Sequence, residues 1–184
     1  MKRTITIIAL GLFLMASTQS WAQEQGQIRA SVSLALGTEA AISDTGDSKL
    51  GMGINIGGDY FVIDKLSIAP SYTFFFKSSY GADTDFGNTE LSVKSSSFNI
   101  DGKYYLLTEG VNLYGLFGIS FASAKVTANF LGTPIDIKDN KTGINIGAGV
   151  DFDLSDKLFL NGQVKYNTPL EQLVIGVGVG YVIK

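Results

Sequence analysis

Six charged side chains are the residues of this sequence best placed to act together, because they share one face of the strands predicted from the sequence. They are three cations and three carboxylates: Arg29, Lys103, Lys165, Asp59, Asp101 and Asp151. Isolated charges are costly in a narrow interior, so equal numbers of opposite charges favour pairing. We therefore predict a structural ion-pair network in the interior. A conducting or gated pore lined by the same groups is the alternative.

Catalytic chemistry has little support in the composition. The sequence contains no histidine and no cysteine, which removes the commonest general base, the commonest transition-metal ligand, disulfides and thiol nucleophiles. No serine lies in a recognisable nucleophile motif, and no pair of carboxylates stands out by its spacing. We predict a protein that is not an enzyme and has no catalytic residues, cofactor or metal.

The acidic stretch 83–90 is a segment where a cation could bind. Its carboxylates and its asparagine are oxygen ligands, but the full pattern of a calcium loop is missing. We prefer a solvated acidic loop to a calcium site. Gly147 and Gly149 lie inside a predicted strand that no helix follows, so they do not indicate phosphate binding.

Residues 1–22 have the pattern of a secretory signal peptide. Lys2 and Arg3 precede an apolar stretch, and small residues stand at Ser20 and Ala22, before the expected cleavage site. The apolar stretch is shorter than the roughly 20 residues of a spanning helix. The predicted mature domain, 23–184, keeps 12 of the 14 basic residues and all 17 acidic ones, which does not favour a nucleic-acid partner.

The elements that must position the charged groups are β-strands. Apolar residues alternate with small or polar residues along segments of about ten residues, and turn residues separate the segments. The predicted strands cover residues 28–37, 49–62, 66–77, 95–107, 111–124, 142–154, 157–167 and 172–183. Pro70 counts against a central position for the third strand. The fifth strand is the least regular, because Tyr114 and Leu116 fall on its polar face.

The connections between these strands alternate in length. Tight turns at 63–65, 108–110 and 155–157 alternate with longer polar loops at 38–48, 78–94 and 125–141. This alternation is typical of a barrel with short turns at one rim and longer loops at the other. The predicted fold is all-β, an eight-stranded antiparallel up-and-down transmembrane β-barrel.

Aromatic residues separate a membrane barrel from a soluble one. On the apolar face, rings fall near both ends of the strands: Tyr60, Tyr104, Phe152 and Tyr181 near the turns, and Phe74, Phe76, Phe121 and Tyr166 near the loops. Amphipathic rings settle at headgroup depth, so two aromatic belts around an aliphatic band predict an outward face in lipid. The charged face then lines an interior that the side chains of eight strands can fill.

The whole pattern resembles the small eight-stranded outer-membrane β-barrels of the type of outer membrane proteins A, X and W. The resemblance covers residues 27–183 and rests on the signal peptide, the eight alternating segments and the ending 178–184. Such barrels usually end with an aromatic residue that the assembly machinery reads. Here Lys184 takes that place, and Tyr181 is the nearest aromatic residue. Enzymes among such barrels rely on histidine, which this chain lacks.

The resemblance implies a place in the outer membrane, with the longer loops outside the cell and the short turns and both termini in the periplasm. It implies contact with outer-membrane lipid, including lipopolysaccharide, and with the barrel assembly machinery during insertion. Our first hypothesis is a non-enzymatic role in envelope structure or surface interaction, with an unknown surface partner. One alternative is a narrow porin or a path by which small solutes, hydrophobic ones included, cross the membrane. Another is a soluble secreted barrel that binds an apolar ligand.

Overall fold

The computed structural model describes residues 24–42, 48–84, 87–109, 111–130 and 133–184. The predicted signal peptide, residues 1–22, lies outside this part of the chain. The described residues form strands, apart from turns and one short 3-10 helix, η2 (Thr168–Leu170). No helix among them is long and apolar enough to cross a membrane.

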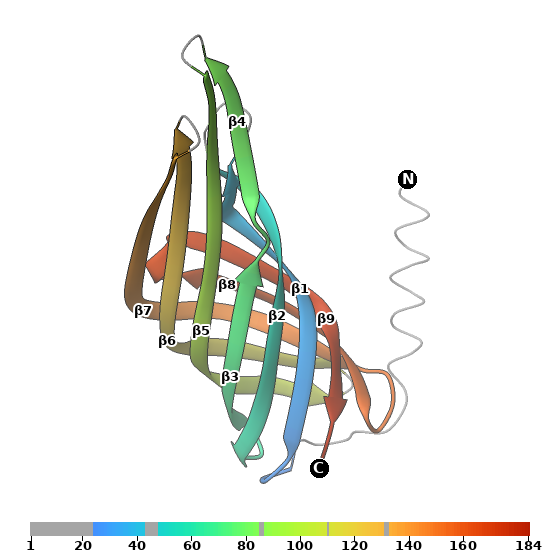
Figure 1. Cartoon of the computed structure of the whole chain (residues 1–184). Coiled ribbons are helices and arrows are strands. Elements are labelled where there is room, and N and C mark those ends of the chain that lie inside the picture. Colours follow the sequence, from blue (N-terminus) through green and yellow to red (C-terminus); the bar gives the residue numbers. More distant parts are fainter. Residues whose placement is uncertain (1–23, 43–47, 85–86, 110, 131–132) are drawn as a thin grey trace, which may run out of the picture.

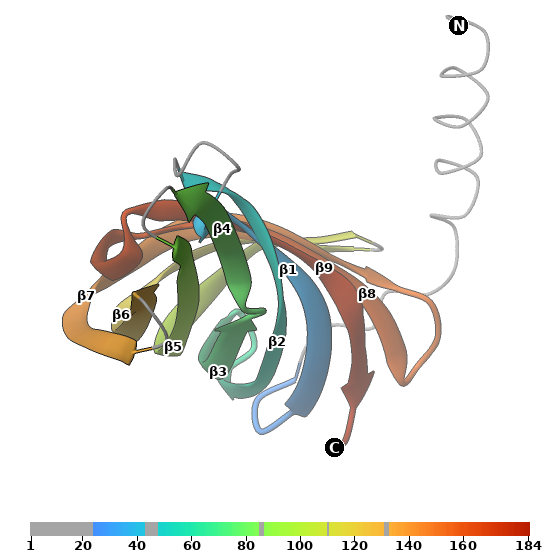
Figure 2. The ribbon, with the colours of Figure 1, turned by 45° about the horizontal axis from the view of Figure 1, so that its top comes forward.

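The strands form one closed antiparallel sheet (Figure 1, Figure 2). In chain order they are β1 (Ile28–Ile42), β2 (Ser48–Ile63), β3 (Leu66–Phe75), β4 (Ser78–Thr84), β5 (Gly87–Glu109), β6 (Val111–Phe130), β7 (Thr133–Asp153), β8 (Leu158–Asn167) and β9 (Gln172–Val182). β1 pairs with β9 and β3 pairs with β5, which closes the barrel. β4 continues β3 along β5 after a break at 76–77. The predicted eight-stranded barrel is confirmed, with its third strand in two segments.

The barrel has two different rims. At one end, the turn rim, short connections link β2 to β3, β5 to β6 and β7 to β8. Both described ends of the chain meet there, because the backbone N–H of Ile28 donates to the carbonyl of Lys184 at 2.8 Å. The opposite end, the loop rim, carries η2 and the hairpins β4–β5 and β6–β7.

The loop rim differs from the sequence prediction. Strands continue through most of the predicted polar loops 38–48, 78–94 and 125–141, so this part of the prediction was wrong. The hairpins β4–β5 and β6–β7 extend far beyond the barrel wall (Figure 1). Polar cross-strand contacts help to hold the β6–β7 hairpin: Lys125 Nζ lies 2.9 Å from Asp136 Oδ2, and Thr127 Oγ1 donates to Asp136 Oδ1 at 2.7 Å. These two hydrogen bonds lower the pKa of Asp136.

Pro70 lies inside a strand that is paired on both sides. On the β5 side it stands opposite Ile100, whereas the β2–β3 ladder skips residues 69 and 70. Proline has no N–H to give to a ladder, and the gap towards β2 accommodates this loss. The argument from Pro70 against a central third strand was therefore wrong.

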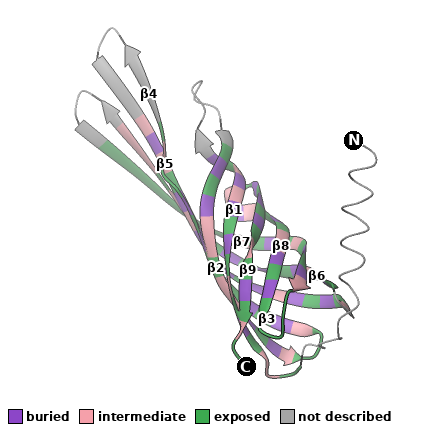
Figure 3. Cartoon of the chain, turned by 90° about the vertical axis from the view of Figure 1, so that its right-hand side faces the viewer, coloured by how far each residue is buried: buried purple, intermediate pink, exposed green. Residues whose placement is uncertain are grey.

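Burial alternates along the barrel strands (Figure 3). Outward side chains are apolar and exposed, as at Ile56, Phe117 and Val177, which are 62, 60 and 65% exposed. Inward side chains are buried, including Tyr114 and Leu116, as their place on the polar face predicted. A soluble barrel with an apolar interior would show the opposite arrangement. The apolar outside of this barrel suits hydrocarbon instead.

Exposed rings lie on the outward face near both rims. They are Tyr60, Tyr104 and Tyr181 near the turn rim, and Phe74, Phe76, Phe121 and Tyr166 near the loop rim. The register fixes their depth, because Tyr60 stands opposite Ile28, the first residue of β1. Phe152 is half-buried. These rings bracket a band that is mostly aliphatic, as the sequence predicted, although the exposed ring of Phe117 lies within it.

The outward face leads to a test with substitutions at two depths. We expect Val177→Arg, in the middle of β9, to lower the free energy of unfolding by about 2–4 kcal/mol, because it places a charge in hydrocarbon. Ile183→Arg, just beyond β9 at the turn rim, should cost about 0–1 kcal/mol, because the charge reaches the headgroups. Urea unfolding in lipid vesicles, followed by heat-modifiable gel mobility, measures both. Equally small losses at both positions would contradict a lipid-facing band.

Candidate functional site

The six charged residues predicted to line the interior all lie in it, and they form three ion pairs. The pairs are Arg29 Nη2 with Asp151 Oδ2 at 2.7 Å, Lys103 Nζ with Asp59 Oδ1 at 2.8 Å, and Lys165 Nζ with Asp101 Oδ2 at 3.0 Å. They join β1 to β7, β5 to β2, and β8 to β5, none of which are neighbours in the sheet. The Lys103–Asp59 pair therefore spans one intervening strand, β3, and each of the other two pairs spans two intervening strands. All six residues are at most 8% exposed.

Asp151 receives two further hydrogen bonds. Tyr105 Oη donates to its Oδ2 at 3.2 Å, and Asn161 Nδ2 donates to its Oδ1 at 2.6 Å. With Arg29, donors from β1, β5 and β8 converge on this one carboxylate. A buried carboxylate needs such partners, because removing its charge from water is costly unless hydrogen bonds and an opposite charge compensate.

A chain of side-chain amides satisfies the carboxylate of Asp101. Asn145 Nδ2 donates to Asp101 Oδ1 at 2.8 Å and to Asn99 Oδ1 at 3.0 Å. Asn145 Oδ1 in turn accepts from Asn167 Nδ2 at 2.8 Å, and the same Nδ2 donates to Ser120 Oγ at 2.7 Å. The donors and acceptors follow one another, so this chain of side chains links four strands, β5, β6, β7 and β8, through buried groups.

Aromatic rings enclose the guanidinium of Arg29. Its central carbon lies 3.7 Å from the ring centroid of Phe159 and 5.7 Å from that of Phe61. Phe61 begins a row of rings in which the centroids of Phe61 and Tyr105 lie 5.2 Å apart, and those of Tyr105 and Tyr114 lie 5.1 Å apart. Cation–π contacts of this kind gain strength where water is excluded.

Two glycines make room for these rings. The ring of Phe159 lies against Gly180 and the ring of Tyr114 lies against Gly149, where a Cβ atom would overlap ring atoms. Lys103 Nζ lies 4.9 Å from the centroid of the same Tyr114 ring. The interior of an eight-stranded barrel is just wide enough for its side chains to fill. Glycine at these two positions leaves the space that the rings occupy.

Sequence reasoning identified the charges but missed Phe61 and Tyr105. Phe61 stands two residues after Asp59, and Tyr105 stands two residues after Lys103. Strand periodicity alone places each ring on the same inner face as the charge before it. That signal is present in the sequence. It placed Tyr114 on the polar face, but it was not applied to Phe61 and Tyr105.

Apolar residues close the interior towards the loop rim. Leu170 of η2 packs against the buried residues Ala35, Ala40, Phe75 and Val174. Below them, two cavities that Asn55 helps to line have volumes of about 20 and 10 Å³. A cavity needs about 10–15 Å³ of such volume to hold one water molecule. Each of these two cavities therefore has room for about a single water molecule.

The contacts of the six charged residues are internal to the barrel. Each carboxylate is engaged by a cation, and no group of three histidine, cysteine, aspartate or glutamate side chains in the described residues could hold a metal ion. The side chains of 83–90, which we predict to form a solvated acidic loop with a calcium site as the alternative, lie outside the described residues. The three ion pairs hold strands together through the attraction of opposite charges. Each of the six charged groups is engaged in this way.

Solved structures share this fold at low sequence identity. Ail of Yersinia pestis, solved with the heparin analogue sucrose octasulfate, is 20% identical with a TM-score of 0.58, over 86% of this chain and 99% of that chain. OprG from Pseudomonas aeruginosa is 14% identical with a TM-score of 0.62, over 88% and 98%. AlkL, solved in lipid bilayers, is 15% identical with a TM-score of 0.52, over 91% and 94%. At these identities the likeness shows the fold alone.

The sequence comparisons give the family. No curated protein matches the chain. The pattern of the family described as outer membrane protein beta-barrel domain matches residues 6–182, which is nearly the whole chain. The chain therefore belongs to this family, and its closed sheet is a transmembrane β-barrel of the outer membrane.

Proposed function

We propose that this chain is a non-enzymatic outer-membrane barrel whose interior is a structural ion-pair network and whose loop rim serves surface interactions. The observation that carries the proposal is that all three interior ion pairs join strands that are not neighbours in the sheet. The interior cavities of about 20 and 10 Å³ also favour a structural role over conduction.

The proposal includes an orientation. The loop rim, with the hairpins β4–β5 and β6–β7, faces the outside of the cell, and the turn rim with both termini faces the periplasm. Two observations support this: the short connections are collected at one rim, and the described chain ends meet at that same rim. Short periplasmic turns and longer outer loops are general in such barrels. The outward face contacts membrane lipid, including lipopolysaccharide, after the barrel assembly machinery has inserted the chain.

Removing Arg29 tests the network. We expect Arg29→Ala to lower the free energy of unfolding by about 3–5 kcal/mol, because it leaves the buried charge of Asp151 without a cation. The double variant Arg29→Met with Asp151→Asn should recover most of this loss, since neither charge then remains. Urea unfolding in vesicles, followed by gel mobility, measures the change, because the single tryptophan lies in the predicted signal peptide.

Lys125→Ala is the matched control for Arg29→Ala. Like Arg29→Ala, it removes the cation of an ion pair with an aspartate. Both side chains of this pair, Lys125 and Asp136, are about half exposed. Exposed pairs contribute little, so stability should hardly change. If Arg29→Ala is no more harmful than Lys125→Ala, the interior pairs do not have the structural role proposed for them.

A second candidate function is a path for small hydrophobic molecules through the barrel wall. Towards the loop rim the last rung of the β2–β3 ladder joins Gly53 to Phe75, whereas the register of β2 with β1 continues through residues 48–52. The backbone N–H of Phe76 donates to the carbonyl of Met52 at 2.8 Å where β2 and the third strand part. Both side chains are exposed and apolar. This place in the wall is where a hydrophobic solute could leave for the membrane.

Two measurements separate these candidates. With the structural proposal, planar-bilayer recordings of the purified barrel should show no conductance steps, and producing the barrel in cells should not raise their uptake of a small hydrophobic dye. Faster dye uptake without conductance would favour the path through the wall. Stable conductance steps would contradict both candidates and would favour an open interior.

A further inference from the structure

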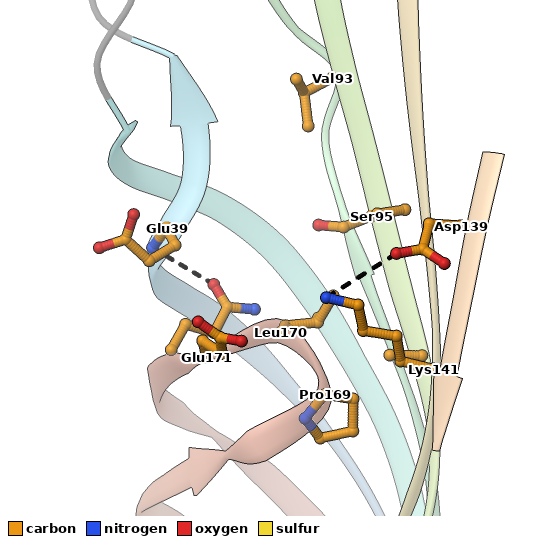
Figure 4. A pocket seen from close by; sticks show the side chains of 11 residues that line it. Glu39, Val93, Ser95, Asp139, Lys141, Pro169, Leu170 and Glu171 are labelled. Carbon is orange, nitrogen blue, oxygen red and sulfur yellow. Dashed lines mark hydrogen bonds and ion pairs between the residues drawn. The ribbon is translucent and has the colours of Figure 1, made fainter. Parts of the chain in front are cut away.

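A cavity of about 260 Å³ opens at the loop rim, outside the ion-pair network (Figure 4). It lies between the end of β1, the strands β5, β6 and β7, and η2, which contributes Pro169 and Leu170. Binding sites for drug-sized molecules typically have about 300–1,000 Å³. The mouth cavity, as we name this space, is therefore suited to a small molecule.

Two buried polar groups in the wall of the mouth cavity lack a hydrogen-bond partner. Gln172 is 1% exposed, and its Oε1 accepts from the backbone N–H of Glu39 at 3.3 Å, which fixes the orientation of its amide. Its Nε2 has no partner, and neither has the Oγ of Ser95, which is 7% exposed. Buried polar groups are nearly always satisfied, so each of these two atoms points to a polar partner that a ligand in the cavity would supply.

The charged groups around the mouth cavity favour a cation. Figure 4 shows Glu39 and Glu171 on one side, with Asp139 and Lys141 opposite them. Lys141 Nζ lies 3.8 Å from Asp139 Oδ2, so its charge is partly compensated within the wall. The described lining residues contain no second cation for Glu39 and Glu171. An anion would meet the two carboxylates of Glu39 and Glu171, whereas an ammonium group would pair with them.

The position of Glu171 in the fold supports a role for its carboxylate. Its backbone has a φ of 52°, and among the described residues it is the sole residue other than glycine with a positive φ. Glycine or asparagine takes this left-handed conformation more easily, so a glutamate here costs some stability. A glutamate therefore stands at a position where the backbone conformation by itself favours glycine or asparagine.

We propose that the mouth cavity binds a small amphipathic cation with an ammonium group and a hydroxyl or carbonyl oxygen on a short apolar body. The ammonium group pairs with Glu39 and Glu171, and the oxygen meets Gln172 Nε2 and Ser95 Oγ. The apolar body packs against Leu170 and its neighbours in the wall. The inference rests on the proposed surface role of the loop rim and names the ligand class for it.

The test uses the whole barrel in nanodiscs of zwitterionic lipid and three probes with the same six-carbon chain. Aminohexanol should shift the side-chain amide signal of Gln172 in a saturable NMR titration. Hexylamine should bind about tenfold more weakly, because it leaves the two buried groups unpaired. Hydroxyhexanoate, which carries the opposite charge, should not bind measurably.

Variants then locate the binding site. Ser95→Ala and Gln172→Met should each weaken aminohexanol binding about tenfold, read from the backbone signal of Leu170. Ser96→Ala makes the same change one residue along β5, on the opposite face, and should leave binding unchanged. Glu171→Gln changes an exposed side chain, so the fold should persist while affinity and its dependence on salt both fall.

Each variant is first checked for heat-modifiable gel mobility, so that a lost fold is not taken for lost binding. No saturable shift with aminohexanol, or equal binding of hydroxyhexanoate, would overturn the proposed ligand class. Equal affinities for wild type, Ser95→Ala and Gln172→Met would overturn the mouth cavity as the site. None of these results bears on the ion-pair network, which the unfolding of Arg29→Ala tests separately.

Discussion

The ladder between β1 and β9 is the contact on which the rest of this structure depends, because it closes the sheet. In hydrocarbon an unpaired backbone N–H or C=O costs several kcal/mol, and a closed sheet pairs nearly all of them. Closure also divides the side chains between two environments. Apolar residues such as Val177 must face outward into lipid, and the alternate residues, charges included, must lie inside. The ion pairs are therefore a consequence of closure as much as a support for it.

Eight strands enclose so little space that interior side chains must fit one another closely. The six charges occupy this space only because each carboxylate has a cation within 3.0 Å and amide or hydroxyl donors around it. Glycines opposite the rings of Phe159 and Tyr114 supply the remaining room. A wider barrel could leave its polar face to water. This barrel satisfies its polar face internally, which connects the small strand number to a closed interior.

Period-two alternation explains what the sequence could predict. It gave the strands, the outward aromatic rings and the interior position of Arg29 and the other five charges, because parity survives small errors in strand ends. It could not pair Arg29 with Asp151, since that contact depends on how neighbouring strands are staggered around the barrel. It also ended the strands too early at the loop rim, where outward side chains are polar. The mouth cavity could not be predicted, because its walls come from five separate segments of the chain.

The loop rim follows different rules from the interior below it. Beyond the membrane the outward side chains of a strand meet water and can be polar. The alternation of apolar outward and polar inward residues is therefore no longer imposed there, and inward side chains can be apolar. Val126 stands opposite Ile137 on the inner side of the β6–β7 hairpin, and Ile137 is 64% exposed. Directly below, Gln172 and Ser95 keep unpaired polar atoms, and the interior also has two, Arg29 Nε and Asn112 Oδ1. The two levels differ instead in how their charges are arranged. In the interior every carboxylate is engaged by a cation, whereas at the rim Glu39 and Glu171 line an open cavity, so the rim is the level at which a ligand can reach charged groups.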